Sequence, residues 1–166
     1  PIPKESEDEI WDRFKTASDL IYSKRKEFVS HIKDEQKENL EKKKSLATSI
    51  TAYANYTSDK ISEWNSKTKE ILDFQKQWEK TGAMPRESAK QINKEFWVSF
   101  KSFFNNKSEF FKSLESERED NLNIKKELIA QAESLLDSTD WQKTTEILKD
   151  LQIKWSEIGP VPEKYR

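Results

Sequence analysis

The sequence contains no cysteine and only one histidine, His31, among its 166 residues. Without cysteine the chain has no disulfide, no thiolate nucleophile and no cysteine-ligated zinc site. A single histidine also excludes a metal centre built from several histidines. No apolar run approaches the roughly 18 residues that a membrane-spanning helix needs, and no signal peptide is recognisable. We therefore expect a protein without a metal centre and without a membrane segment.

Glycine and proline are also scarce, with two glycines and five prolines in the whole chain. Little material is therefore available for tight turns or for loops that cradle phosphates. Aromatic residues nevertheless make up 11 %, including six tryptophans, and charged residues make up 37 %. This combination favours long amphipathic helices that bury aromatic side chains on one face. The 30 basic and 31 acidic side chains nearly cancel, which argues against a dedicated polyanion binder.

No catalytic or nucleotide-binding pattern is recognisable. The sequence has no Walker A, dinucleotide-binding, zinc or nucleophile-elbow motif. Acidic residues are so abundant that accidental spacings on helices are expected, and no isolated pair stands out as general acid and base. We therefore assign no catalytic, cofactor-binding or metal-ligating residue, and we expect a protein that is not an enzyme and needs no cofactor. His31 is expected at the surface.

The few glycines and prolines fall into three clusters, which are residues 1–3, 82–85 and 159–162. Each cluster is expected to separate two helices, because the residue before a proline avoids the helical conformation. Glycine often closes a helix in the left-handed conformation, so we expect positive φ at Gly82 and Gly159. Replacing either by valine should then cost about 1 kcal/mol or more. Ser6 and Ser88 follow the first two clusters and are expected to open capping boxes.

The chain contains two copies of one unit. In the first part of each copy, residues of the same type recur 82 positions apart, as Pro3 and Pro85 do. Further on the interval is 77 positions, as between Trp64 and Trp141, because a connector in the second copy is shorter. The expected divisions are a first repeat over residues 1–84, a second over 85–161 and the start of a third over 162–166.

Each repeat is expected to hold a long helix and a shorter antiparallel one. The long segments contain no glycine or proline, and serine, threonine and aspartate gather in the connectors, as helix N-caps require. The expected long helices cover residues 6–54 and 88–136, and the short ones cover 58–80 and 139–157. The predicted fold class is therefore all-α, with tandem helical repeats forming an elongated, spectrin-like array of three-helix bundles.

The short helices carry a seam at alternating four- and three-residue spacing, which is typical of a helix packed on a partner. Its members are Trp64, Thr68, Ile71, Gln75 and Trp78, and then Trp141, Thr145, Leu148, Gln152 and Trp155. Folding the first hairpin about its connector brings Asn39 opposite Gln75. The second hairpin likewise brings Asn121 opposite Gln152. We interpret each pair as a polar contact that fixes register, and the alternative is that the asparagine contacts a ligand.

The aromatic residues also have two interpretations. Tryptophans among lysines can stack on nucleic-acid bases, but a position on a helical seam favours core packing. In the second long helix the aromatic residues form two adjacent stripes, too wide for contact with one helix. These are Phe96, Trp97, Phe100, Phe103, Phe104, Phe110 and Phe111. We therefore expect the first half of a long helix to lie in the cleft of a hairpin and complete a three-helix bundle.

Basic residues gather at one place in each long helix. They are Lys42, Lys43 and Lys44 in the first copy, and Lys125 and Lys126 in the second. Glu38 and Glu41 flank the first cluster at helical spacing, so we interpret it as a solvated, ion-paired face. The alternative is that these lysines, Lys43 excepted, contact nucleic acid.

The segment from Leu151 to Pro162 resembles the signature of a bacterial repeat family catalogued as domain of unknown function 349. In that signature a tryptophan, here Trp155, precedes Gly-Pro-Val-Pro, and a tryptophan and a phenylalanine follow on the next helix. The later positions are supplied by Trp11-Asp12-Arg13-Phe14, Trp97-Val98-Ser99-Phe100, Phe110-Phe111, Asn121-Leu122 and Lys125. The resemblance implies a cytoplasmic bacterial protein with several such units in tandem, and it implies no known activity.

Stacked helical repeats expose long surfaces and need no active site. We therefore expect a non-enzymatic scaffold or protein-interaction rod with an unidentified partner. The alternative is a nucleic-acid-binding or ribosome-associated helical protein. The chain opens on Pro1-Ile2-Pro3 without methionine, so we expect a fragment of a longer array. Its first long helix then lacks a preceding hairpin and its last hairpin lacks a following helix, and we expect self-association that joins the two.

Overall fold

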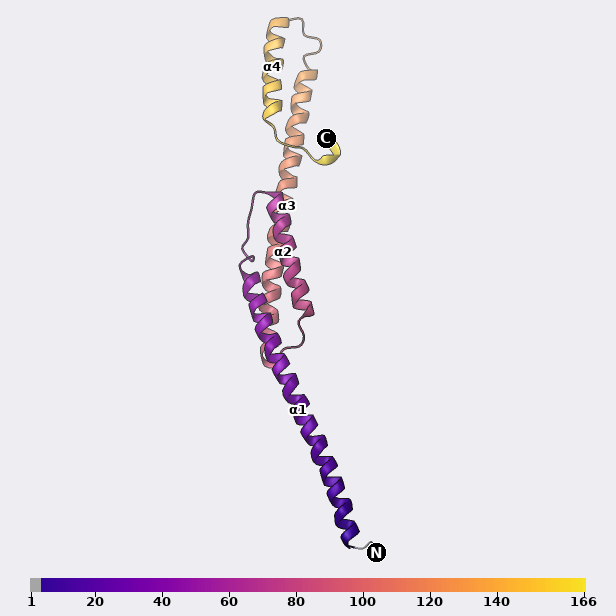
Figure 1. Cartoon of the computed structure of the whole chain (residues 1–166). Coiled ribbons are helices and arrows are strands. Elements are labelled where there is room, and N and C mark those ends of the chain that lie inside the picture. The colour runs from indigo at the N-terminus through magenta and orange to yellow at the C-terminus, as the bar shows by residue number, and fades with distance from the viewer. Residues whose placement is uncertain (1–3) are drawn as a thin grey trace. The chain divides into compact units, whose positions relative to one another are not determined.

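The computed structural model describes residues 4–166, with side-chain surroundings from Ser6 onward. Four α-helices account for most of the chain, and the described residues contain no β-strand. The elements are α1 (Lys4–Thr51), α2 (Ile61–Lys80), α3 (Arg86–Glu133), α4 (Trp141–Glu157) and a short 3₁₀ helix, η1 (Glu163–Tyr165). Long and short helices alternate, which confirms the all-α repeat architecture (Figure 1).

The start of α3 shows that the expected capping boxes are wrong. The carbonyl of Pro85 accepts from the amides of Ser88 and Ala89 at 3.1 Å, so α3 begins at Arg86 and Ser88 lies inside its first turn. The Gln91 side chain donates to Glu95 instead of reaching back to Ser88. Ser6 likewise lies inside α1. The ring of Pro85 fixes its own φ angle just before the first turn of α3, and its carbonyl accepts the first hydrogen bonds of the helix.

Both long helices end earlier than expected, and both do so in the same way. After Thr51 the amide of Tyr53 donates to Ile50 O at 3.0 Å, which is a bond to the carbonyl three residues back. After Glu133 the amide of Leu135 donates to Ala132 O at 3.1 Å in the same pattern. These tighter turns take the chain out of α-helical geometry and into the connectors.

Unit 1, residues 1–104, contains a three-helix bundle. Figure 1 shows the second half of α1, all of α2 and the first half of α3 side by side. The Phe96 ring stacks on Trp78 with centroids 4.1 Å apart, and Phe103 contacts Trp64 at 5.4 Å. The Ser102 hydroxyl donates to Ala54 O at 2.8 Å and ties α3 to the connector. The expected insertion of a long helix into a hairpin cleft is therefore confirmed in this unit.

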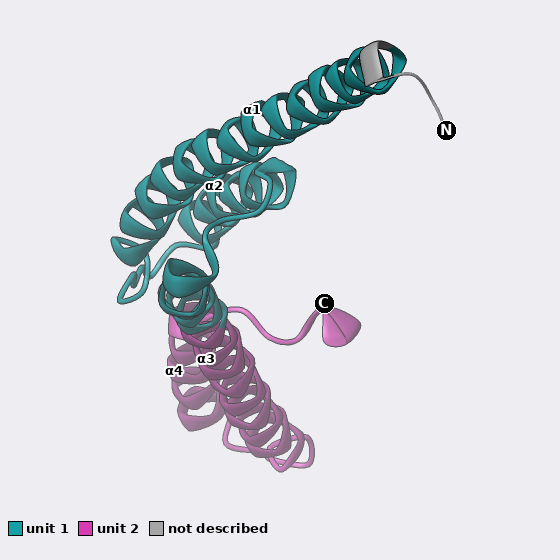
Figure 2. Ribbon diagram, turned by 90° about the horizontal axis from the view of Figure 1, so that it is seen from below, with its two compact units in different colours: residues 1–104 teal, residues 105–166 magenta. Residues whose placement is uncertain are grey.

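Unit 2, residues 105–166, contains a hairpin of two helices (Figure 2). The second half of α3 packs against α4, where Leu128 and Leu151 are both buried. Asp140 caps the start of α4 by accepting from the amide of Lys143 at 3.2 Å. The sequence repeats and the compact units do not coincide, because the first half of α3 packs on the hairpin of the preceding repeat.

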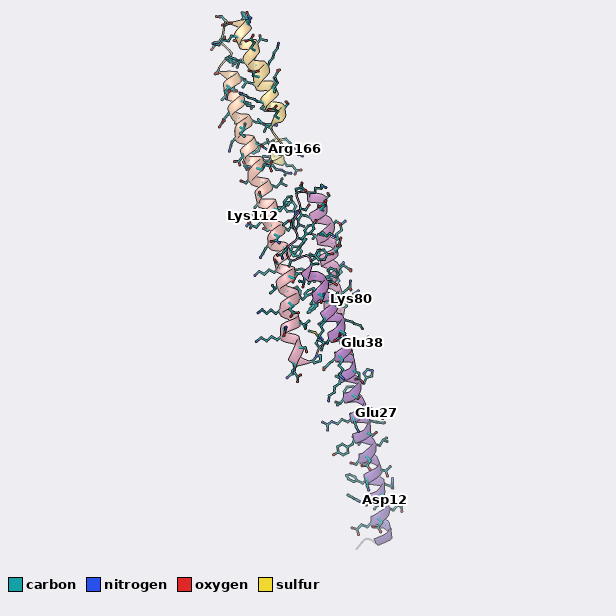
Figure 3. All side chains as sticks on the ribbon, turned by 90° about the vertical axis from the view of Figure 1, so that its left-hand side faces the viewer. Asp12, Glu27, Glu38, Lys80, Lys112 and Arg166 are labelled. Carbon is teal, nitrogen blue, oxygen red and sulfur yellow. The ribbon has the colours of Figure 1, made fainter. Side chains whose placement is uncertain are left out.

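The first half of α1 has no other helix of unit 1 beside it. Figure 3 shows Asp12 and Glu27 on this stretch, which extends past the end of the bundle. Its large apolar side chains are exposed, in contrast to those of the first half of α3. They are Ile10, Trp11, Phe14, Leu20, Ile21, Tyr22, Phe28 and Val29. We refer to residues 6–30 as the free half of α1.

A polar network joins the connector that follows α1 to α2. The Tyr53 hydroxyl donates to Glu70 Oε2 at 2.6 Å, and Lys67 Nζ lies 3.0 Å from the same atom. The hydrogen bond from Tyr53, and then that from Lys67, lowers the pKa of the Glu70 carboxyl. The same Glu70 carboxylate raises the pKa of Tyr53.

Unit 1 should lose stability in acid through Glu70. A lowered pKa in the folded state means that the ionised carboxylate stabilises the fold above the ordinary glutamate pKa. This contribution is lost as the pH falls through the lowered value. Glu70→Gln should therefore flatten the acid limb of a plot of unfolding free energy against pH, and Tyr53→Phe should flatten it partly. Identical acid limbs for Glu70→Gln and wild type in urea titrations would contradict the assignment.

Candidate protein-interaction surfaces

Each repeat carries a contact between a long helix and the loop after the short helix, which we call the Asn–Gly clasp. In the first clasp, Asn39 of α1 donates from Nδ2 to Ala83 O at 3.1 Å. Asn39 is buried, and its amide lies against Gly82. In the second clasp, Asn121 of α3 donates from Nδ2 to Pro160 O at 3.0 Å. The clasp therefore holds the end of each hairpin through one side-chain amide and one backbone carbonyl.

The clasp corrects the expected partners of the two asparagines. We predicted that Asn39 pairs with Gln75, but Asn39 donates to the loop and Gln75 donates to Glu79 at 2.9 Å. Asn121 similarly donates to Pro160 O, while Gln152 is exposed. The predicted pairs were wrong because folding each hairpin about its connector considered only side chains on facing helices. The acceptor in each clasp is a backbone carbonyl beyond the end of the short helix.

The clasp also explains the two glycines, and the explanation differs from the expected one. Neither Gly82 nor Gly159 has a positive φ, so the prediction of a left-handed helix end is wrong. The short helices end at Thr81 and Ile158, whose backbones are both in the extended conformation. A Cβ atom added at Gly82 would lie 2.8 Å from Asn39 Nδ2. At Gly159 it would lie 3.0 Å from Asn121 Nδ2, so both glycines make room for an asparagine.

The two prolines of the motif open the following helical segment. Pro85 precedes α3, and its carbonyl accepts from the amides of Ser88 and Ala89 in the first turn of that helix. Pro162 precedes η1, and its carbonyl accepts from the amide of Tyr165 at 2.9 Å. The two copies of the motif therefore have the same local role in the backbone.

A lysine of each long helix lies over the second tryptophan of each short helix. Lys43 Nζ is 4.9 Å from the centroid of Trp78, and Lys125 Nζ is 4.8 Å from that of Trp155. Burial lowers the pKa of Lys43. The remaining lysines of the basic clusters are also engaged. Lys42 pairs with Glu38 at 2.8 Å, Lys44 pairs with Glu41 at 3.1 Å, and Lys126 lies 5.5 Å from the Tyr165 centroid.

Equivalent tryptophans differ sharply in exposure between the two units. Trp64 is 1 % exposed and Trp78 is 5 % exposed in unit 1. Their counterparts Trp141 and Trp155 are 74 % and 42 % exposed in unit 2. The prediction that these tryptophans pack in a core is therefore confirmed for Trp64 and Trp78 and is wrong for Trp141 and Trp155. The difference follows from the third helix, because α3 covers the first pair, whereas the described residues of unit 2 include no third α-helix.

The uncovered face of unit 2 forms a groove between α3 and α4. Leu148 and Leu151 line one hollow of about 390 Å³, and Lys126 and Arg166 line a second of about 480 Å³. Ile129 and Trp155 line both hollows, and we refer to the two hollows together as the α3–α4 groove. Most of its lining residues are apolar, and its end near η1 holds Lys126 and Arg166.

The described residues show no metal-ion site. They include no group of three or more histidine, cysteine, aspartate or glutamate side chains placed to hold a metal ion. His31 is exposed, as expected. In the described part of the chain no helix is both long enough and apolar enough to cross a bilayer.

The structure is that of a tandem helical-repeat protein. Long and short helices alternate, each repeat has an Asn–Gly clasp, and the second repeat supplies the third helix of the first bundle. The family model described as "Domain of Unknown Function (DUF349)" matches residues 9–87 and again residues 91–164. The chain therefore belongs to this family and contains its unit twice. No curated protein and no solved structure matches the chain.

Proposed function

We propose that this chain is a non-enzymatic helical-repeat scaffold whose hairpins bind amphipathic helices of protein partners. As the family resemblance implies, we further propose a bacterial, cytoplasmic protein. The observation that carries the proposal is the difference between the two hairpins. The first hairpin holds Phe96 and Phe103 of α3, and the second presents the same kind of apolar face uncovered.

The groove has the properties expected of a site for a helix. Helix-in-groove recognition uses apolar anchors at three- and four-residue spacing on one face of the ligand. In unit 1 the buried residues of α3 have this spacing, at Ile92, Phe96, Ser99 and Phe103. The equivalent hairpin of unit 2 offers Trp155 and Leu151 to such a face. A partner helix with similar anchors would bury apolar surface that is now exposed to water.

The alternative function, nucleic-acid binding, receives less support from the lysines. Lys42 and Lys44 are paired with glutamates at helical spacing, and the carboxylates offset the positive charge that these lysines present to a phosphate. Lys125 lies over Trp155 of α4, and Lys126 lies over Tyr165 of η1. The net charge of −1 also provides little long-range attraction for a polyanion.

Binding of two labelled probes to the 166-residue chain tests the proposal. The first probe is a synthetic peptide of residues 86–104, the segment that fills the hairpin of unit 1, and the second is a mixed-sequence single-stranded RNA. At physiological salt we expect fluorescence anisotropy to show micromolar binding of the peptide and much weaker binding of the RNA. Ile129→Glu together with Leu148→Glu should weaken peptide binding at least tenfold, because both side chains line the groove.

Two results would argue against the scaffold. The first is a peptide that does not bind, or that binds equally well to the groove variant. The second is sub-micromolar RNA binding with an affinity that falls steeply with salt, which is typical of phosphate contacts and favours the nucleic-acid alternative.

A further inference from the structure

We propose that the occupant of the α3–α4 groove is the free half of α1 from a second copy of this chain. This inference rests on the proposed function, because it names the partner of the same groove. The chain contains one hairpin that is filled, one that is open, and one amphipathic half-helix without a hairpin. Joining the last two would repeat between molecules the packing that unit 1 shows within a molecule.

The buried positions of α3 recur on the free half of α1. In the first part of each copy, residues of the same type recur 82 positions apart, as Pro3 and Pro85 do and as Asn39 and Asn121 do. At this interval the buried residues Ile92, Phe96, Ser99 and Phe103 correspond to Ile10, Phe14, Ala17 and Ile21. Large side chains match large ones, and the small Ser99 matches the small Ala17. The free half of α1 therefore carries the same four-residue pattern as the helix that fills the first hairpin.

The groove retains an open face for the key aromatic contact. In unit 1 the Trp78 ring contacts Lys43 and Phe96 at the same time. In unit 2 the Trp155 ring has the equivalent lysine contact, and it is 42 % exposed. The ring of Phe14, which is 64 % exposed on α1, has the place of Phe96 in this arrangement. The docked helix would stack Phe14 on Trp155 and direct Ile21 toward Trp141.

Charge complementarity sets the same direction for the docked helix. With Phe14 against Trp155, the first turns of α1 lie at the end of the groove near η1. Those turns are acidic, with Glu7, Asp8 and Glu9 in succession. That end of the groove holds Lys126 and Arg166. Opposite charges therefore meet in the orientation that the apolar pattern requires, and like charges would meet less favourably in the reverse one.

Sedimentation equilibrium of the 166-residue chain over low to high micromolar concentration tests the proposal. We expect the weight-average mass to rise with concentration. Phe14→Glu with Ile21→Glu should weaken association at least tenfold, because it places two charges on the docking face. The matched control is Thr16→Glu with Ser23→Glu, which adds the same charge to the opposite face of the same helix and should associate like the wild type. Circular dichroism establishes that each variant retains its helices.

A mixing experiment distinguishes specific docking from general stickiness. The α1 variant keeps an intact groove, and a variant with Ile129→Glu and Leu148→Glu keeps an intact α1. Each should be monomeric alone, and together they should form a complex of one copy of each. A wild-type chain that stays monomeric would overturn the inference, as would an α1 variant that associates normally or a mixture that forms no such complex. If the peptide of residues 86–104 still binds the groove, the proposed function survives and only the identity of the partner fails.

Discussion

Replacing Phe96 by alanine should lower the unfolding free energy of unit 1 by about 3–5 kcal/mol, which is the usual cost of deleting a buried aromatic side chain. Phe96 is fully buried, and its ring stacks on Trp78 at 4.1 Å. The substitution removes this stacking and leaves a cavity between α2 and α3. Urea unfolding monitored by tryptophan fluorescence measures the effect, because Trp78 is adjacent to the deleted ring.

The chain supplies its own control for this prediction. Phe14 is the counterpart of Phe96 at the interval of 82 residues, but it is exposed on the free half of α1, beside which no other described helix of unit 1 lies (Figure 1). Phe14→Ala deletes the same atoms and should change unfolding free energy by less than about 0.5 kcal/mol at concentrations where the chain is monomeric. Equal losses for the two variants would mean that the free half of α1 folds back onto its own bundle.

The second large effect is expected at Gly82. Gly82→Ala should lower the unfolding free energy of unit 1 by about 1–3 kcal/mol, because the new methyl group would lie 2.8 Å from Asn39 Nδ2. Asn39 is buried and hydrogen-bonded to Ala83 O, so its amide cannot move aside without losing that bond. Gly159→Ala should cost less, because the corresponding distance is 3.0 Å and Asn121 is less buried.

A double-mutant cycle separates this explanation from one based on backbone conformation. In the Asn39→Ala background the space beside Gly82 is open, and φ there is not positive. Gly82→Ala should then become neutral or stabilising by about 0.4–1 kcal/mol, because alanine restricts the unfolded chain more than glycine does. A cost that persists unchanged in the Asn39→Ala background would contradict steric contact with the asparagine as the cause.

The features that could be predicted from sequence are those carried by side-chain patterns. Helical periodicity, the intervals of 82 and 77 residues and the aromatic stripes of α3 predict four helices and a third helix in the first hairpin. The structure confirms these through the Phe96–Trp78 and Phe103–Trp64 contacts. Apolar burial depends mainly on which side chains share a face, and this information is present in the sequence.

Several of the errors concern the backbone, which sequence patterns describe poorly. Asn39 and Gly82 were correctly singled out, but the acceptor is the Ala83 carbonyl, and carbonyl positions are not visible in a list of residue types. Glycine at a helix end usually indicates a left-handed residue, whereas here the extended Thr81 already ends α2. The small size of Gly82, and not its conformational freedom, is what the fold uses. Only the position of the asparagine across the hairpin reveals this.

The chain order of unit 1 has a consequence for its synthesis on the ribosome. The hairpin of α1 and α2 is complete at Lys80, but its third helix follows it in the chain and ends, for this unit, at Phe104. At about 5–20 residues per second, the intervening segment takes about 1–5 s to be translated. During that interval Trp64 and Trp78 are uncovered on the nascent chain, as Trp141 and Trp155 are in unit 2. The growing polypeptide therefore exposes the apolar face of the α1–α2 hairpin until the first half of α3 has been translated and packs on it.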